Sequence, residues 1–404
     1  MAAKQSSWLD RTVLGVGLTS LLSDWSHETA TAILPAFLAT IGAGPAWLGA
    51  IEGAADGLSS VAKLTAGHYT DQLRRRKPLV LAGYVVTSFA TASFALATQA
   101  VHVFAGRVIA WLGRGIRTPA RKTLLAASVP PEAYGRAFGL ERLMDTLGAI
   151  AGPLSALWLL RHTSHDYRHV FWWTLVPGLL AVLCFWLFVR ERRFAPAPAR
   201  SFWEGLGALP AKFRRFLLAV GVFGAGDFSH TLLILYAARQ LAPQMGAVKA
   251  ATAAIGLYTL HNAFYAGSAY VSGWMGDRIR RRDLILAAGY ALAGLTAILL
   301  SLGSRRIGVI AAVFLFAGIF VGTEEALEDS LAAEITPREQ HGMAFGTLAA
   351  VNAAGDFVSS LLVGVLWSVF SATAAFGVSA TLFFLGAGLL VGLRLSSGLP
   401  SRPS

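Results

Sequence analysis

The sequence has little of the charge that a soluble protein uses to stay in water. Only 14% of its 404 residues are charged, 55% are hydrophobic, and the mean hydropathy is +0.57. A soluble domain of this length has too little interior to bury so much apolar surface. Runs such as residues 284–303 reach the roughly 20 residues that a helix needs to cross about 30 Å of hydrocarbon. We therefore predict a helical protein that crosses a membrane many times.

Cysteine and the common enzyme signatures are also scarce. Cys184 is the single cysteine, so no intrachain disulfide can form. The segment "HETAT" (27–31) has threonine where a zinc protease of the His-Glu-x-x-His type needs its second histidine, and no phosphate-binding P-loop occurs in the sequence. We expect neither an enzyme nor an ATP-driven pump, and therefore no catalytic residues and no cofactor.

Acidic residues are fewer than basic ones, at 22 against 34. Their placement argues against nucleic-acid binding, because 26 Lys and Arg fall on one set of loops and tails and only 6 on the opposite set. The positive-inside rule then places both termini in the cytoplasm of a bacterial-type inner (plasma) membrane. We predict twelve spans, near 12–38, 46–66, 78–98, 103–125, 137–160, 170–190, 214–238, 252–274, 284–303, 308–330, 342–367 and 372–394.

The two halves of the chain repeat each other. "SDWSHET" (23–29) returns as "GDFSHTL" (226–232), and "GHYTDQLRRRKPLVLAGY" (67–84) returns as "GWMGDRIRRRDLILAAGY" (273–290). Internal repeats around a site near the bilayer midplane are typical of secondary transporters. We predict a six-helix bundle over 1–190, a cytoplasmic linker over 191–213 and a second six-helix bundle over 214–404.

Three motifs extend this interpretation. The first is Gly67, Asp71 and the basic run that follows; the second is "GAIAGP", with Gly148, Gly152 and Pro153; the third is "RVIAWLGRGIRTP", which begins at Arg107. With these motifs the chain resembles the major facilitator superfamily, and in particular its drug/proton antiporter branch. The resemblance implies an all-α membrane protein with two pseudo-symmetric six-helix bundles around a central cavity lined by helices 1, 4, 7 and 10. It also implies a monomer that exports small organic compounds by alternating access, driven by a proton gradient.

Ionisable residues inside spans are costly and usually functional. Asp24, His27 and Glu28 share one face of the first helix, because side chains three and four positions apart are neighbours. Two close carboxylates in a low dielectric cannot both ionise cheaply, so we interpret Asp24 and Glu28 as the proton-coupling pair and His27 as a relay. The alternative is a static network that holds helices together. The complete predicted coupling and cavity set is Asp24, His27, Glu28, Glu52, Asp56, Arg107, Asp145, Asp227 and His230.

Opposite charges occupy matching positions in the two halves. In the register of the repeat, Arg117 aligns with Glu324 and Arg121 with Glu328. We predict a cytoplasmic gate in which these ends attract each other, the alternative being that each end pairs within its own half. By resemblance, Asp71 contacts a helix end of the opposite half, while Arg74 and Arg75 bind nearby carboxylates. The predicted gate comprises Asp71, Arg74, Arg75, Arg117, Arg121, Asp277, Glu324, Glu325 and Glu328.

The duplicated Asp-x-x-His pattern allows a second function. Nitrogen and oxygen ligands from two facing helices suit a divalent transition metal. The alternative hypothesis is therefore a carrier of metal ions or metal chelates that uses Asp24, His27, Glu28, Asp227 and His230.

Overall fold

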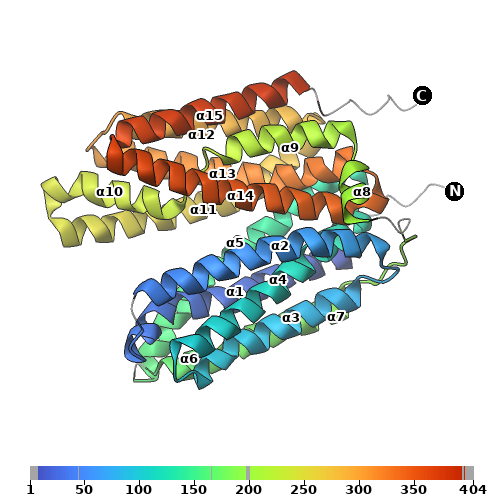
Figure 1. Ribbon diagram of the computed structural model, residues 1–404, viewed down its shortest axis with the longest axis horizontal. Coiled ribbons are helices and arrows are strands. Elements are labelled where there is room, and N and C mark those ends of the chain that lie inside the picture. Colours follow the sequence, from blue (N-terminus) through green and yellow to red (C-terminus); the bar gives the residue numbers. More distant parts are fainter. Residues whose placement is uncertain (1–7, 44, 165, 197–200, 394, 396–404) are drawn as a thin grey trace. The chain divides into compact units, whose positions relative to one another are not determined.

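The computed structural model describes residues 8–43, 45–164, 166–196, 201–393 and 395, and within them every regular element is a helix (Figure 1). The side chains of Glu52 and Asp56 lie outside this description, so those two predicted cavity residues stay predictions. The α-helices are α1 (Arg11–Thr40), α2 (Pro45–Gln72), α3 (Lys77–Ala92), α4 (Ala100–Ser128), α5 (Tyr134–His162), α6 (Tyr167–Trp173), α7 (Leu175–Phe188), α8 (Phe202–Gly207), α9 (Ala211–Gly224), α10 (His230–Met245), α11 (Ala247–Ile279), α12 (Arg282–Ser301), α13 (Ile307–Ile335), α14 (His341–Val369) and α15 (Ala372–Leu393). Short 3₁₀ turns are η1 (Ser93–Leu96), η2 (Pro131–Ala133) and η3 (Arg338–Gln340).

The chain forms two compact units. Unit 1 comprises Met1–Ala133, Leu140–Leu209 and Thr336–Ala350, and unit 2 comprises Tyr134–Gly139, Pro210–Ile335 and Val351–Ser404. Each unit therefore includes the beginning of one long helix, α5 or α14, whose remainder belongs to the other unit. We describe each unit by itself.

The helices follow the predicted spans closely. Within the described residues, seven helical segments are long and apolar enough to cross a membrane: Lys77–Leu96, Pro131–His162, Tyr167–Phe188, Arg282–Ser301, Ile307–Ile335, Arg338–Val369 and Ala372–Leu393. The remaining predicted spans coincide with α1, α2, α4, α11 and the pair α9 and α10. Helix α4 carries five basic side chains, which lowers its hydropathy although its length is sufficient.

The predicted span 214–238 is wrong as a single helix. Helix α9 ends at Gly224 and α10 begins at His230, and Asp227 lies in the break, where its backbone N–H donates to the Gly224 carbonyl over 3.1 Å. Two causes combine: glycine favours helix poorly, and the Ser229 hydroxyl caps α10 by accepting from the Thr231 N–H. A continuous helix would have placed Asp227 and His230 on one face, and because of the break they do not share a helical face.

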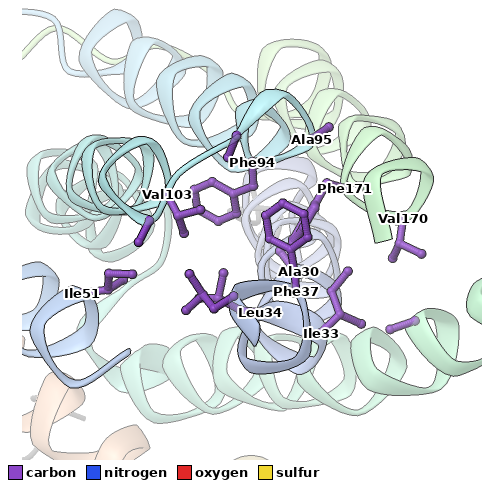
Figure 2. Packing of buried hydrophobic residues seen from close by; sticks show 14 of the residues in the cluster. Ala30, Ile33, Leu34, Phe37, Ile51, Phe94, Ala95, Val103, Val170 and Phe171 are labelled. Atoms are coloured by element: carbon purple, nitrogen blue, oxygen red, sulfur yellow. The ribbon is translucent and has the colours of Figure 1, made fainter. Parts of the chain in front are cut away.

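A cluster of aromatic and aliphatic residues closes one end of unit 1 (Figure 2). The ring of Phe171 packs edge-on against Phe37 at 5.0 Å and against Phe94 at 5.5 Å between centroids. Such pairs add about 0.5–1.5 kcal/mol beyond the burial of their area. The cluster fixes α1 against η1 and α6, and so holds the polar middle of α1 in a defined rotation.

Helices α1 and α5 approach closely along a seam of glycines. A Cβ atom on Gly148 would lie 2.2 Å from the Leu21 carbonyl oxygen, and one on Gly152 would lie 2.6 Å from Cβ of Glu28. Small residues let helix backbones meet in this way inside membranes. The motif that includes Pro153 thus brings α5 against the part of α1 that carries the acidic residues.

In unit 2 aromatic rings pack α9 against α12 and α15. Phe223 of α9 lies parallel to Tyr290 of α12, with 3.6 Å between ring centroids and an interplanar angle of 13°, and Phe383 of α15 lies 4.8 Å from Phe223. This stack orients the Tyr290 hydroxyl toward α13.

Candidate functional site

The buried acids of unit 1 are bound by arginines. Asp24 is 6% exposed and accepts from Arg114 NH2 over 2.6 Å. Glu141 pairs with Arg121 over 2.6 Å. Asp145 accepts from Arg142 over 2.9 Å. Three carboxylates on α1 and α5 thus each have a cationic partner, which offsets the cost of burying their charge.

Arg117 is a buried cation whose partners are neutral. It is 2% exposed and donates to the Thr87 hydroxyl over 3.0 Å and to the Ser23 hydroxyl over 2.8 Å, while its guanidinium lies 3.8 Å from the Tyr84 ring centroid. Arg121 likewise bonds to Ser20 of α1. Both arginines therefore have partners in unit 1, and the gate that sets them against Glu324, Glu325 and Glu328 stays a prediction.

Several buried polar atoms at and around Trp111 of α4 have no hydrogen-bond partner. The His27 ring meets Trp111 edge-on at 5.3 Å, and the guanidinium groups of Arg107 and Arg114 lie 5.6 Å and 5.5 Å from the Trp111 ring centroid. Arg107 is 2% exposed and donates to the Thr31 hydroxyl over 3.1 Å. Trp111 Nε1, Arg114 NH1 and His27 Nδ1 are buried and have no hydrogen-bond partner. A buried donor in this condition costs about 1–3 kcal/mol, so the group calls for an explanation.

The acids around Glu324 in the middle of α13 have a different environment. Glu324 of α13 is 8% exposed and forms neither a hydrogen bond nor an ion pair with the described residues. The charged groups around it are carboxylates: Asp227, Glu328, Glu325 and Asp356. Glu328 is held by neutral donors, since the Tyr290 hydroxyl donates to one oxygen and Asn352 Nδ2 donates to the other over 2.7 Å. Glu324 and Glu328 therefore have no lysine or arginine partner among the described residues.

Two histidines and two tyrosines adjoin this acid group. His230 of α10 lies 4.8 Å from His261 of α11 between ring centroids, and His261 stacks on Tyr258 at 5.4 Å. Glu325 accepts from the Tyr265 hydroxyl of α11. His230 is therefore placed next to an aromatic and imidazole group that sequence spacing did not indicate.

The residues of the metal hypothesis divide between the units. Asp24, His27 and Glu28 belong to unit 1, and Asp227 and His230 belong to unit 2. Among the described residues, no group of three or more His, Cys, Asp or Glu side chains is arranged to hold a metal ion. Within unit 1, Asp24 is already bound by Arg114, and His27 Nε2 lies 4.0 Å from Glu28 Oε1.

Asp71 binds the N-terminus of a helix, as the resemblance implied. Asp71 lies beyond the predicted span 46–66. Its carboxylate accepts from the backbone N–H groups of Gly342 and Met343 at the start of α14, both over 2.8 Å. Burial raises the pKa of Asp71 to about 6, although the backbone N–H of Met343 and the Arg76 guanidinium favour the charged form. A helix N-terminus favours a negative group.

The prediction that Arg74 and Arg75 bind nearby carboxylates stays a prediction. Both are exposed, and the cation that pairs with Asp71 is Arg76, 1% exposed, at 3.4 Å. Arg76 also lies 3.8 Å from the Phe194 ring centroid. The three arginines lie between the end of α2 at Gln72 and the start of α3 at Lys77, and of the three only Arg76 is buried.

Asp277 repeats this arrangement in unit 2. It accepts from the N–H groups of Gly135 over 2.8 Å and Arg136 over 2.9 Å at the start of α5, and Arg282 donates to it over 2.7 Å. The two aspartates of the internal repeat are therefore both helix caps, each with an arginine partner.

Arg114 is the residue that sequence reasoning overlooked. Arg114 forms an ion pair with Asp24, but it is absent from the predicted coupling and cavity set. A signal exists, because Arg107, Arg114 and Arg121 are spaced by seven residues and so lie on one face of α4.

Known proteins resemble this chain over 43% to 94% of its length. An uncharacterized MFS-type transporter of Methanocaldococcus jannaschii is 28% identical over 371 residues, which is 89% of each chain. A multidrug resistance protein, MdtH, of Photorhabdus laumondii is 28% identical over 177 residues, 43% of each chain. The crystal structure of the fucose:proton symporter of Escherichia coli superposes with a TM-score of 0.77 at 16% identity, covering 94% of this chain and 98% of the symporter. That structure shares the fold of this chain.

The family assignment rests on both halves. The model of the Major Facilitator Superfamily matches residues 16–242 and again 216–403. Together with the two repeated helix-capping aspartates and the all-helical fold, this match shows that the chain belongs to the Major Facilitator Superfamily of membrane transporters.

Proposed function

We propose that this transporter is driven by protons and exports small organic compounds, with the proton bound by an acid group in unit 2. The acid group comprises Asp227, Glu324 and Glu328. The observation that carries the proposal is Glu324, which is more than nine-tenths buried, has no hydrogen-bond or ion-pair partner among the described residues, and is surrounded by carboxylates. A buried carboxylate without a cation is costly, and binding a proton removes that cost.

We place the proton-binding site in unit 2 rather than at the Asp24 and Glu28 pair of unit 1. Asp24 is compensated by Arg114 at 2.6 Å, so a proton bound there would displace a strong charge-assisted bond. An arginine cannot give up its proton in a protein, whereas a carboxyl group readily binds and releases one. Asp24 is therefore better suited to hold Arg114 in place than to carry the proton.

The surroundings of the acid group supply hydrogen-bond donors rather than positive charge. Glu328 accepts from Tyr290 of α12 and Asn352 of α14, and the neighbouring Glu325 accepts from Tyr265 of α11 with His230 nearby. These neutral donors stabilise a carboxylate after it releases its proton, and none of them neutralises it permanently. The group can thus alternate between two protonation states.

The name of one relative supports export. MdtH is named as a multidrug resistance protein, and it matches 43% of this chain. The distribution of Lys and Arg further supports an inner membrane location with both termini in the cytoplasm. The proposed transporter works as a monomer, with no cofactor, on the energy of the proton gradient.

The metal hypothesis is the weaker candidate. It needs Asp24 as a ligand, and this carboxylate already binds Arg114. No described group of side chains offers a substitute site.

Transport assays in proteoliposomes test the proposal. A panel of small organic compounds is screened with and without an imposed pH gradient, and the best substrate is then measured in two modes: gradient-driven movement and exchange at equal pH. The variant Glu324→Gln should lose gradient-driven movement by more than roughly tenfold and keep exchange, because exchange needs no net proton release. Asp24→Asn should lower both modes together.

The matched control is Glu339→Gln, since Glu339 is an exposed glutamate in η3. It should behave as the wild type in both modes. If Glu324→Gln retained gradient-driven movement, or if Asp24→Asn lost this mode alone, the proton would belong to unit 1 and the proposal would fail.

A further inference from the structure

Two buried donors, on Trp111 and Arg114, have no acceptor among the residues that the structure describes. The indole Nε1 of Trp111 and NH1 of Arg114 can only donate hydrogen bonds, and both are buried without a partner. The His27 ring adjoins Trp111 at 5.3 Å, and its Nδ1 is also without a partner. These three groups come from α1 and α4, which lie in the same unit, so their arrangement is internal to unit 1.

Charge near these donors favours an anion. Helix α4 carries five basic side chains and no acidic one. Arg107 and Arg114 both lie against the Trp111 ring, within 5.6 Å and 5.5 Å of its centroid. One turn further along, Arg117 is buried and bonded only to neutral hydroxyls. A bound anion would therefore meet net positive charge as well as vacant donors.

The ion pair with Asp24 prepares Arg114 for this role. Arg114 uses NH2 to hold Asp24 and leaves NH1 of the same planar guanidinium for another acceptor. The guanidinium fork matches the two oxygens of a carboxylate, and its fixed orientation lowers the entropy lost on binding.

We propose that α1 and α4 form a recognition site for a small organic carboxylate, which accepts from Arg114 NH1 and Trp111 Nε1 beside His27. This inference rests on the proposed function in taking small organic compounds as substrates, and it adds their charge. Substrate recognition then belongs to unit 1 and proton binding to unit 2.

Equilibrium binding tests the site without any gradient. Radiolabelled benzoate is bound to the purified full-length protein at one pH, and unlabelled benzoate, benzamide, phosphate and chloride compete for it. Benzoate should compete at least roughly tenfold better than its neutral analogue benzamide, because the amide lacks the charge that Arg114 binds. Trp111→Phe should weaken benzoate binding by roughly fivefold, since it removes one N–H and keeps a ring. Arg114→Gln should weaken it by roughly tenfold or more.

Arg239 provides the matched control. It is an exposed arginine that lies 5.3 Å from the Trp367 ring centroid in unit 2, and Arg239→Gln should bind benzoate as the wild type does. Size-exclusion profiles and thermal unfolding establish that each variant is folded. If Arg114→Gln does not fold, Trp111→Phe decides the question.

Three outcomes would overturn the carboxylate site. They are equal competition by benzoate and benzamide, unchanged binding in Trp111→Phe, and tighter binding of phosphate or chloride than of benzoate. Because no gradient is present, Glu324→Gln should bind benzoate normally. If the protein binds benzoate but shows no proton-driven transport, only the proposed coupling is contradicted. If it transports only neutral or cationic compounds with the proton gradient, only the carboxylate site is contradicted.

Discussion

Helices α4 and α13 occupy matching positions in the internal repeat and carry opposite charge. Helix α4 has five basic residues and no acidic one, and α13 has five acidic residues and no basic one. The acids of α1 and α5 compensate two of the α4 arginines. In α13, Glu325 and Glu328 accept from neutral hydroxyl and amide donors on α11, α12 and α14, and Glu334, near the end of the helix, pairs with Arg282. The difference follows from chemistry, because a buried arginine keeps its charge, whereas a buried carboxyl group can bind a proton and become neutral.

The largest expected effect comes from neutralising one acid in each unit. Glu141→Gln should lower the free energy of unfolding by about 3–5 kcal/mol, because it leaves the buried Arg121 charge without its partner. Glu328→Gln should leave stability unchanged or raise it, since Tyr290 and Asn352 can still bond to an amide and no cation is exposed. Thermal unfolding of both variants in detergent measures the difference. Equal losses in the two variants would remove the contrast between the units.

A charge swap tests the gate that the repeat suggested. Arg117→Glu should abolish transport, because it places an acid among Ser23, Thr87 and the Tyr84 ring. The gate hypothesis predicts that adding Glu324→Arg restores transport, and the contacts within unit 1 predict that it does not. We expect no rescue in a proteoliposome assay. A double variant that transports clearly better than Arg117→Glu would establish the gate.

A smaller effect is expected at the seam between α1 and α5. Gly148→Ala should destabilise the protein by about 1–3 kcal/mol, because the new methyl group would lie 2.2 Å from the Leu21 carbonyl. The control is Gly267→Ala in α11, where nothing lies within 4 Å of the new atom, and this change should be neutral or mildly stabilising. Unfolding temperatures of the two variants, compared in the same detergent, check this. A Gly148→Ala variant as stable as Gly267→Ala would mean that the helices can separate at no cost.

The smallest effect concerns the pH dependence of Asp71. Its pKa is raised to about 6, so its contribution to stability is greatest at acid pH and declines as pH rises through 6. Between pH 5 and pH 7.5 the wild type should lose about 1 kcal/mol through this residue. In Asp71→Asn that component should be missing, so the unfolding temperature should depend less on pH. An identical pH dependence in both proteins would show that the Asp71 carboxyl group titrates well below this range.

The sequence by itself determined the helical membrane fold, the repeat and the positions of the ionisable residues. Length and hydropathy suffice for spans, because crossing about 30 Å of hydrocarbon demands a long apolar helix whatever its neighbours are. The repeat likewise identified Asp71 and Asp277 before their helix caps were visible. The sequence also placed Gly148 and Gly152 in one motif, and the structure shows that both glycines lie against α1.

Only the tertiary structure decided which charges have partners. Spacing places side chains on one face of a helix, but it does not say which residue of another helix faces them, since this depends on the rotation and packing of both. The sequence suggested that Asp24 interacts with Glu28, but in the structure Asp24 forms an ion pair with Arg114. Arg76, rather than Arg74 or Arg75, pairs with Asp71. A break in the helix before His230 separates this residue from α9, which ends at Gly224. The function of a buried acid depends on which donor or cation it contacts, and the packing of the helices determines that contact.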